Sequence, residues 1–255
     1  MSEPTVSVVI PTHNRPAECL VAVRSALAQT APPTEVIVVD DHSNDGDSRA
    51  LGDALSGEQA VTLISRSAGP RGPAAARNAG IEAAGGSLVA FLDDDDEWLP
   101  EKLERQLPWF ARGYEVVCSN ARRSSGGQYF ETSGDHGISR DELLAHNPVI
   151  FSTAVVNRSL LDRAGRLDES GHLIGIEDYE LLLRLSDESA RMVRVGDCLA
   201  VYRDDGYERL SNKKAQMAAA VARMSARRSL RRPFDTAQHR ATVRNVTTAL
   251  LTAPG

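Results

Sequence analysis

Four short runs of aliphatic, mostly β-branched residues divide the first hundred residues of the chain, and each run ends in polar or turn-forming residues. The runs are Val6–Ile10, Val36–Val39, Val61–Ile64 and Leu88–Leu92. Short, almost continuously apolar segments are typical of strands that are buried on both faces of a sheet. We therefore expect four buried strands, joined by the segments between them.

The connecting segments predict helices. After the first run, Asn14 is a candidate cap and Pro16 a first-turn residue, and apolar residues recur at helical spacing as far as Leu27. A second helix is predicted over Ala74–Ala84, behind the Gly- and Pro-rich loop 69–73. Alternating strands and helices indicate an α/β fold with a Rossmann-like, mostly parallel central sheet that is flanked by helices.

The pattern is less regular after Pro100. We expect two helices and three strands there, and the remaining sequence is polar and rich in turn residues. The helices are predicted at Glu101–Phe110 and Glu177–Ser186, and the strands at Glu115–Ser119, Val149–Val156 and Cys198–Tyr202.

From residue 211 onward the sequence is rich in Ala, Met and Arg, and it predicts two helical stretches split near Pro233. Two interpretations of this helical C-terminal extension are open. It is either an amphipathic pair packed on the core with solvated arginines, or a surface that contacts an anionic acceptor or a membrane. Its basic cluster consists of Arg223, Arg227, Arg228, Arg231 and Arg232.

The composition argues against several classes of protein. The 255 residues carry 29 basic and 35 acidic side chains, and this net charge of −6 argues against a nucleic-acid-binding protein. Cys19, Cys118 and Cys198 form no CxxC pair, so neither a disulfide framework nor a zinc site is predicted. The chain shows no basic and apolar leader and no apolar run near the ~18–20 residues of a transmembrane segment. We expect a cytoplasmic protein.

The run Asp93–Asp96 directly follows the fourth apolar run. Because side chains alternate along an extended backbone, Asp93 and Asp95 are expected to face one way and Asp94 another. Carboxylate oxygens placed in this way suit Mg²⁺ or Mn²⁺, whose remaining positions water and phosphate fill. The alternative is a solvated acidic turn.

Polar residues also follow the first two runs. Thr12, His13 and Asn14 follow the first, and Asp40 and Asp41 end the second. In a parallel sheet the carboxyl ends of the strands share one edge, and ligands bind beyond that edge. The topology therefore predicts that these residues and the acidic run lie around one site.

The chain contains five motifs in order: VVIPTHNR at 8–15, VVDDHS at 38–43, AARNAG at 75–80, FLDDDDEW at 91–98 and GIEDYEL at 175–181. Together these motifs resemble family 2 glycosyltransferases of the GT-A fold, over about Val6 to Arg203. This resemblance implies inverting transfer of a sugar from a nucleotide-diphosphate sugar to an acceptor hydroxyl, with Mn²⁺ or Mg²⁺ as the cofactor.

The resemblance gives roles to the acidic residues. Asp93 and Asp95 would hold the cation, and Asp94 would contact the donor ribose or sugar. An acceptor hydroxyl must lose its proton as it attacks, so the site needs a base, and Asp178 matches the Glu-Asp motif of the family. Glu177 is the rival, with orientation of the base or contact with the acceptor as its expected role. Asp96 is expected to support the turn.

The resemblance also assigns the nucleotide to the first two strand ends. Pro11, Thr12, His13 and Asn14 would line the base pocket, and Asp40 or Asp41 would accept a hydrogen bond from the base or ribose. Without the family, the segment that begins Asp40-Asp41 is also a plain turn signal.

Arg77 lies near a predicted helix start, where its guanidinium and the free backbone N–H groups could meet a phosphate. The alternative is a surface arginine on an Ala-rich helix.

One departure from the family pattern follows Arg203. Many members carry a histidine near this point that helps to hold the cation, whereas this chain reads Asp204-Asp205-Gly206. Either a carboxylate replaces the histidine or the third ligand is absent.

We therefore predict a GT-A glycosyltransferase domain at 1–210 and the helical extension at 211–255. Within the domain, residues 1–100 would bind the nucleotide sugar, a UDP-, GDP- or dTDP-sugar, and residues 101–210 the acceptor, a polysaccharide, glycolipid or small natural product. Peripheral membrane contact and a homodimer are compatible with this interpretation. The alternatives are a catalytically degenerate nucleotide-binding protein of the GT-A fold and a sugar nucleotidyltransferase.

Overall fold

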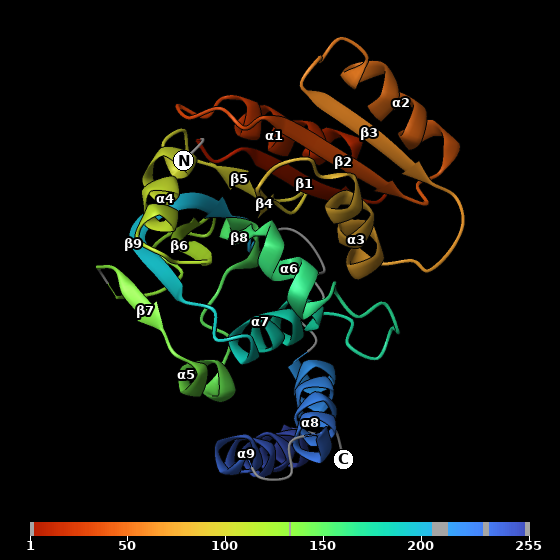
Figure 1. Cartoon of the computed structure of the whole chain (residues 1–255). Helices are drawn as coiled ribbons and strands as arrows, with labels where there is room; N and C mark the ends of the chain where they lie inside the picture. Colours follow the sequence, from red (N-terminus) through yellow and green to blue (C-terminus); the bar gives the residue numbers. More distant parts are fainter. Residues whose placement is uncertain (1–2, 133, 206–213, 232–234, 253–255) are drawn as a thin grey trace.

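The computed structural model describes residues 3–132, 134–205, 214–231 and 235–252. The described strands form a single nine-stranded sheet (Figure 1). They are β1 (Val6–Thr12), β2 (Glu35–Asp41), β3 (Val61–Arg66), β4 (Leu88–Phe91), β5 (Glu97–Trp98), β6 (Val116–Arg123), β7 (His136–Ile138), β8 (Val155–Asn157) and β9 (Met192–Tyr202).

The order of the strands across the sheet is β3-β2-β1-β4-β8-β6-β9-β5, and β7 pairs with β9 outside this path. The pairs β1–β2, β2–β3, β1–β4 and β6–β9 are parallel, whereas β8 runs antiparallel to both β4 and β6. The chain leaves β1 toward β2 and β3, and then returns to the other side of β1 with β4. This reversal makes the carboxyl ends of β1 and β4 the topological switch point, where ligands bind in open α/β sheets.

Helices cover both faces of the sheet. They are α1 (Pro16–Leu27), α2 (Asp45–Leu55), α3 (Pro73–Ala83), α4 (Lys102–Ala111), α5 (Arg140–Ala145), α6 (Arg158–Ala164), α7 (Glu177–Asp187), α8 (Lys214–Arg231) and α9 (Thr236–Thr252), together with a 3₁₀ turn, η1 (Phe151–Thr153).

Alternation along the strands divides the core between the two faces. In β1, Val8 and Ile10 pack in the cluster that contains the buried residues of α1, α2 and α4. Val9 packs on the opposite face, in the cluster that contains residues of α3, α5, α6 and α7. The sheet therefore has an apolar layer on each side, which explains why its first four strands read as almost continuous apolar runs.

Most of the predicted elements are confirmed, including the four N-terminal strands and the two C-terminal helices. The strand predicted at Val149–Val156 is wrong in its first six residues, because β8 begins only at Val155. There the chain turns through η1, where the Thr153 N–H and hydroxyl both donate to the Ile150 carbonyl, and only then enters β8. Pro233 and the boundary predicted at residue 210 lie outside the described residues.

Two local predictions near the first strand ends need correction. Asn14 does not cap α1, because Arg15 is the cap residue, without a side-chain cap bond, and Asn14 has a left-handed backbone with φ of 54°. Helix α2 was not expected, since its first residues resemble a turn. Asn44 caps it by accepting hydrogen bonds from the N–H groups of Gly46 and Asp47.

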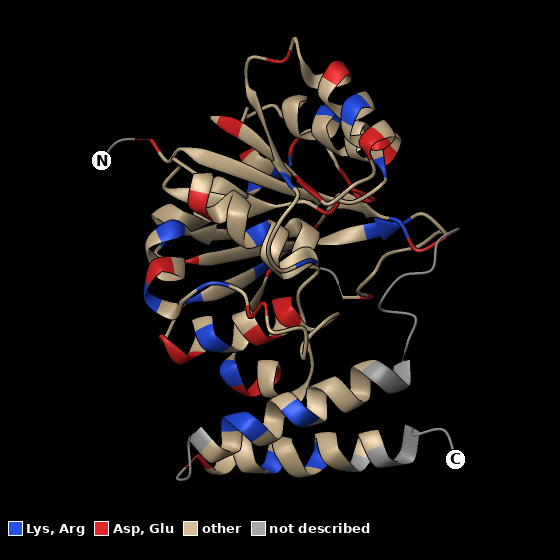
Figure 2. Cartoon of the chain, turned by 90° about the vertical axis from the view of Figure 1, so that its right-hand side faces the viewer, with Lys and Arg blue, Asp and Glu red and all other residues tan. Residues whose placement is uncertain are grey.

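The C-terminal helices α8 and α9 pack side by side beneath the rest of the chain (Figures 1 and 2). Arg228 of α8 pairs with Asp187 of α7 at 2.5 Å, and Asp235 before α9 pairs with Arg140 of α5 at 2.5 Å. We call α8 and α9 the C-terminal hairpin. Among the helices that the structure describes, none is both long and apolar enough to span a bilayer.

Helix α3 lies so close to β1 that the contact requires glycine. A Cβ atom added to Gly80 would lie 2.3 Å from Cγ1 of Val9. We expect Gly80→Ala to lower the free energy of unfolding by about 1–3 kcal/mol through overpacking, as measured by urea denaturation. Gly52→Ala in α2 is the control, because its nearest neighbour would be 3.8 Å away. That change should be neutral or stabilising by up to about 1 kcal/mol. Equal effects of the two changes would contradict the packing argument.

Candidate active site

A cavity of about 850 Å³ opens at the carboxyl edge of the sheet, at the switch point between β1 and β4. It is walled by the strand ends, by α3 and α7, and by residues of the C-terminal hairpin. All of the predicted site residues except Asn14 and Asp40 line it. They are Pro11, Thr12, His13, Asp41, Arg77, Asp93, Asp94, Asp95, Glu177 and Asp178.

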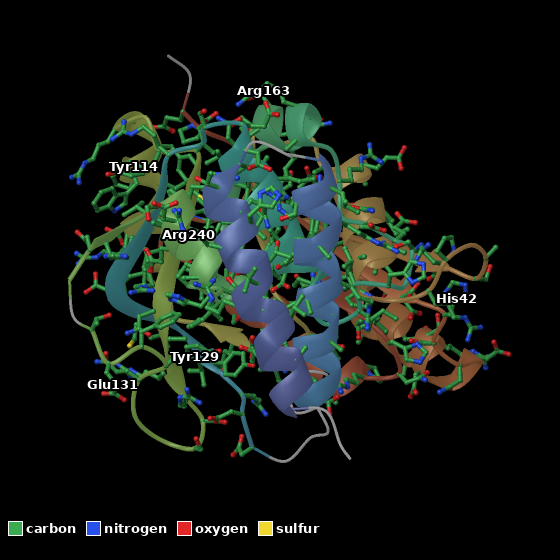
Figure 3. The ribbon with its side chains drawn as sticks, turned by 90° about the horizontal axis from the view of Figure 1, so that it is seen from below. His42, Tyr114, Tyr129, Glu131, Arg163 and Arg240 are labelled. Carbon is green, nitrogen blue, oxygen red and sulfur yellow. The ribbon has the colours of Figure 1, made fainter. Side chains whose placement is uncertain are left out.

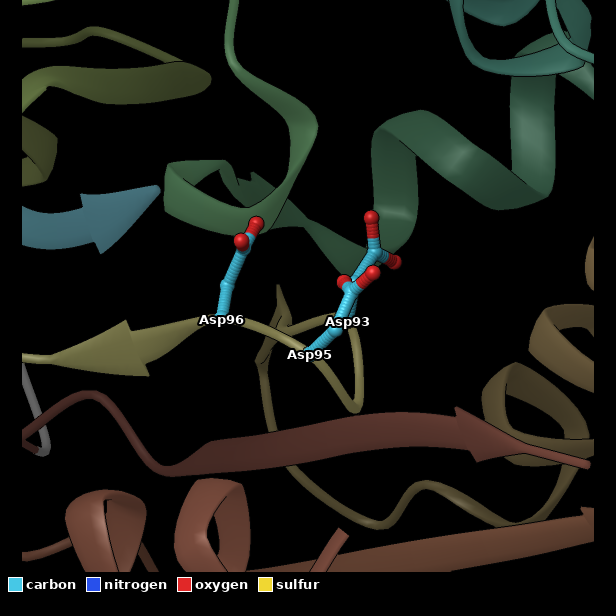
Figure 4. Close-up of side chains that lie close together, drawn as sticks. All are labelled: Asp93, Asp95 and Asp96. Carbon is cyan, nitrogen blue, oxygen red and sulfur yellow. The ribbon is translucent and has the colours of Figure 1, made fainter. Parts of the chain in front are cut away.

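The acidic run forms a tight turn rather than an extended segment. The Asp96 N–H donates to the Asp93 carbonyl at 3.1 Å, so residues three apart come together. Carboxylate oxygens of Asp93, Asp95 and Asp96 all lie within 4.8 Å of one another, and the three side chains project from the same side of the turn (Figure 4). Asp96, which was expected to support the turn, accepts a hydrogen bond from the Arg203 N–H at 3.0 Å, and the turn also brings its carboxylate into this acidic group.

Asp94 points away from this group. Its Oδ2 accepts a hydrogen bond from the Thr12 hydroxyl at 2.8 Å, which joins the ends of β1 and β4. The Arg15 guanidinium lies 3.5 Å from Asp94 and 3.3 Å from Asp95. Burial raises the pKa of Asp94 to about 7, against the lowering effect of the Thr12 hydrogen bond. Arg15 is the last residue of the first motif, but it was not predicted as a site residue.

Arg77 is not a surface arginine. It is 5% exposed, and its two terminal nitrogens donate to different acids, Asp93 at 2.6 Å and Glu177 at 3.0 Å. The guanidinium also lies over the Phe151 ring, 5.1 Å from the centroid. Its Nε is buried and has no hydrogen-bond partner among the described residues. Arg77 thus ties the acidic turn to the start of α7.

Glu177 and Asp178 open α7 and have different surroundings. Both Glu177 oxygens are engaged, one by Arg77 and the other by the Gly175 N–H at 2.7 Å. Asp178 is half-buried and accepts a hydrogen bond from the Tyr179 N–H at 2.7 Å. Burial and the neighbouring Glu177 charge raise the pKa of Asp178 to about 7, against the lowering effect of Arg77. Glu177 is therefore held in place, whereas Asp178 can exchange a proton near neutral pH.

The ends of β1 and β2 are joined to each other. His13 Nδ1 lies 2.8 Å from the Asp41 carbonyl oxygen, and the Asp41 carboxylate accepts from the Gly72 N–H at 2.6 Å and from Arg66. Asp41 thereby fixes the loop that leads into α3.

Asn14 and Asp40 serve the neighbouring loop instead of lining the cavity. The Asn14 side-chain oxygen accepts from the Asn44 N–H at 2.8 Å, and Asp40 accepts from the Ser43 N–H at 3.3 Å.

The acid that follows Arg203 does not join the metal-binding candidates. Asp204 accepts from the Ser125 N–H at 3.0 Å and from Arg123 at 3.1 Å, outside the group formed by Asp93, Asp95 and Asp96. The structure thus does not support Asp204 as the replacement for the family histidine. Asp96 is instead the third candidate metal ligand, beside Asp93 and Asp95.

The residues of the acidic turn fit a hard divalent cation. The three clustered ligand atoms are all carboxylate oxygens, the donors that Mg²⁺ and Mn²⁺ prefer. Among the residues that line the cavity, the carboxyl groups outnumber the guanidinium groups of Arg15, Arg71 and Arg77. These carboxyl groups belong to Asp41, Asp93, Asp94, Asp95, Glu177 and Asp178. This excess of negative charge favours a bound cation.

Comparison with known proteins finds relatives that are named as glycosyltransferases. An uncharacterized glycosyltransferase of Haemophilus influenzae is 34% identical over 46% of this chain and 46% of its own length, so the chain matches about half of that relative. The Escherichia coli WfgD, a UDP-Glc:α-D-GlcNAc-diphosphoundecaprenol β-1,3-glucosyltransferase, is 29% identical over 84% of this chain and 82% of its own.

Among solved structures, the mannosyltransferase PcManGT of Pyrobaculum calidifontis, in complex with GDP-Man and Mn²⁺, superimposes with a TM-score of 0.70 at 20% identity. The match covers all of this chain and 77% of PcManGT. This likeness confirms the predicted GT-A fold.

The model of glycosyl transferase family 2 matches residues 7–164, which contain the acidic turn, Arg77 and the strands that converge on the cavity. The match covers more than half of the chain, and this protein therefore belongs to glycosyl transferase family 2.

Proposed function

We propose that this protein transfers a sugar from a nucleotide-diphosphate sugar to an acceptor hydroxyl, with inversion at the anomeric carbon and with a divalent cation bound. The observation that carries the proposal is the cavity at the switch point. It brings together two clustered carboxylates, Asp93 and Asp95, and a carboxyl group of raised pKa, Asp178. An acidic metal site and a separate base are the two parts that such a transfer needs.

The nucleotide would bind along the ends of β1 and β2. Thr12, His13 and Asp41 line this part of the cavity, and Asp41 is held rigidly by Gly72 and Arg66. The name of WfgD gives UDP-glucose as its donor, and PcManGT was solved with GDP-mannose. These names support a nucleotide-sugar donor for this chain.

Asp93, Asp95 and Asp96 would hold the cation. When bound, Mn²⁺ or Mg²⁺ neutralises the negative charge that develops on the leaving diphosphate. In the structure Arg77 and Arg15 already offset part of the carboxylate charge, at 2.6 Å from Asp93 and 3.3 Å from Asp95. Arg77 is buried and donates to both Asp93 and Glu177, so it holds these two residues at a fixed separation. Its Nε has no hydrogen-bond partner among the described residues.

Asp178 would act as the general base. Its carboxylate takes the proton of the acceptor hydroxyl as the hydroxyl oxygen bonds to the anomeric carbon. The bond between that carbon and the diphosphate oxygen breaks, and the nucleoside diphosphate leaves with the electron pair. A single displacement of this kind inverts the anomeric centre. A pKa of about 7 suits the role, because proton transfer is most effective when the base titrates near the working pH.

The acceptor would approach from the side formed by the second half of the chain. Asn147, Val149, Ile176 and Tyr179 line the cavity there. The mixture of polar and apolar walls suits a sugar joined to a less polar group, and WfgD acts on a sugar linked to a lipid diphosphate. A glycolipid acceptor is the class that we favour.

A nucleotide-binding protein without turnover is the alternative. It rests on Asp204, which stands where family members have a metal-binding histidine but is bonded to Ser125 and Arg123. Nucleotide binding without sugar transfer, over a broad set of acceptors, would favour this alternative.

The acidic turn can be tested by thermal unfolding with UDP, GDP, dTDP or CDP, with and without Mn²⁺. A ligand that binds only the folded chain raises its melting temperature. We expect one nucleotide to raise it in the presence of Mn²⁺, and expect Asp95→Asn and Asp96→Asn each to remove the Mn²⁺-dependent part. Asp204→Asn is the matched control and should retain it. A full response from both of the first two variants would exclude the turn as the metal site.

The role of Asp178 can be tested with Asp178→Asn, which keeps the shape and the bond to Tyr179 N–H. We expect kcat for sugar transfer to fall by about 10²–10⁴-fold, while the nucleotide-dependent rise in melting temperature is retained. Asp162→Asn, an exposed acid on α6, should leave both unchanged. Transfer at the wild-type rate by Asp178→Asn would remove Asp178 as the base.

The raised pKa of Asp178 also predicts a pH dependence of stability. The folded chain holds this proton up to about pH 7, whereas the ordinary pKa is 3.8, so ionisation favours the unfolded chain between these values. Asp178→Asn removes this effect. Its stability relative to the wild type, measured by urea denaturation without ligands, should therefore increase from about pH 4 to about pH 7 and then level off. A constant difference over this range would show that the pKa is not raised.

A further inference from the structure

The C-terminal hairpin differs in charge from the rest of the chain. Between Lys214 and Thr252 the sequence has eight Lys or Arg residues and one acidic residue, Asp235, although the whole chain carries a net charge of −6. The basic residues of this segment appear as blue bands on the two lower helices (Figure 2). A positive segment on a negative protein points to an anionic partner.

Part of this charge holds the hairpin in place. Arg228 is buried and pairs with Asp187 of α7, and Arg244 donates to the Leu144 carbonyl of α5. Asp235 is held by Arg140 at 2.5 Å, so the one acid of the segment is already paired. Ala220, Met224 and Ala241 are buried in the core cluster beside these pairs.

The other side of the hairpin, which we call the outer face, combines exposed arginines with exposed apolar residues. Leu230 is 83% exposed and Val243 69%, and Val246 is also exposed. Arg223 lies seven residues before Leu230 on α8, and Arg240 lies three before Val243 on α9, so each arginine shares a helix side with an apolar residue. Viewed from below, the two helices lie over the rest of the chain (Figure 3).

Apolar side chains next to arginines, on helices whose own sequences contain no acidic residue, are the features of a helix that lies in a bilayer interface. The apolar residues enter the boundary of the acyl chains, while arginines reach the lipid phosphates. A nucleic acid would use the positive charge but not Leu230 or Val243, which would remain exposed to water. The composition of the outer face therefore favours a lipid surface.

The hairpin also belongs to the cavity. Met217 and Val221 of α8 and Asn245 of α9 line it, opposite the strand ends. The same two helices thus present one side to the cavity and another to solvent.

We propose that the outer face of the C-terminal hairpin binds the surface of an anionic lipid bilayer and so places the acceptor side of the cavity at the membrane. The binding follows from the outer face alone. The delivery of a lipid-linked acceptor rests in addition on the proposed function.

The test is co-sedimentation of the full chain with vesicles of phosphatidylcholine alone and of phosphatidylcholine with 30% phosphatidylglycerol. We expect binding to the anionic vesicles that weakens as salt is added, because each basic side chain near such a surface contributes about fivefold in affinity. The double variant Arg223→Glu with Arg240→Glu should weaken binding by about 25-fold or more. Leu230→Ser with Val243→Ser should weaken it at both low and high salt.

The matched control is Arg24→Glu with Arg49→Glu, which makes the same change in net charge at exposed positions on α1 and α2. This control should bind the anionic vesicles almost as the wild type does. The proposal is overturned if the wild type binds neither vesicle, or if the two charge-reversed variants lose affinity equally. Light scattering tests the alternative that a second copy of the chain covers the outer face. That alternative would hold if the wild type is a dimer that does not bind vesicles, and if Leu230→Ser with Val243→Ser dissociates the dimer.

Vesicle binding requires no turnover, so its outcome is independent of the proposed function. If the wild type binds anionic vesicles but shows no sugar transfer, the transferase proposal fails and the docking surface stands. If the wild type transfers sugar to a water-soluble acceptor but does not bind vesicles, the docking proposal fails and the transferase proposal stands.

Discussion

The Arg77 guanidinium, held between Asp93 and Glu177, is the interaction on which the site depends. It is buried, and the two carboxylates that it contacts come from segments 16 and 100 residues away in sequence. Breaking one side of a buried ion pair is strongly destabilising, because the remaining charge is left without compensation. The position of α7, and with it that of Asp178, is therefore coupled to the position of the acidic turn.

Helix α3 supports this contact in two ways. Gly80 lets the helix approach β1 closely, and Asn78, next to Arg77, exchanges hydrogen bonds with the backbone of Leu167 at 2.9 Å in both directions. The loop that leads to α7 is thus fastened to the same helix that carries Arg77. An Ala-rich helix with little side-chain bulk allows these close approaches on several sides at once.

Local signals in the sequence were sufficient for much of the fold. The apolar runs predicted β1 to β4, because both faces of this half of the sheet are covered and the strands need no alternation. Helix α2 was missed because its first turn, with Asp45 and Gly46, has the composition of a loop. The segment before β8 was predicted as a strand because two residues of its 3₁₀ turn, Phe151 and Thr153, are types that strands also prefer.

The site was less predictable than the fold. Most of the residues that line the site could be predicted from the topology, because the carboxyl ends of neighbouring parallel strands meet at one edge of the sheet. The pairing of Arg77 with Glu177 depends on a tertiary contact, and the approach of Asp96 to Asp93 and Asp95 depends on a turn. Neither has a periodic signal in the sequence. Arg15 was overlooked for the same reason, since its reach across to Asp94 and Asp95 joins residues about 80 positions apart.

The long separations within the site have a consequence for how the protein is made. Thr12 contacts Asp94 across 82 positions and Arg77 contacts Glu177 across 100, so each contact closes a long loop. The entropy of loop closure delays such contacts until other structure holds the ends together. During synthesis the first hundred residues can pair their strands, yet the site stays open until α7 has left the ribosome. The nascent chain is thus inactive until synthesis has passed Asp187, the last residue of α7.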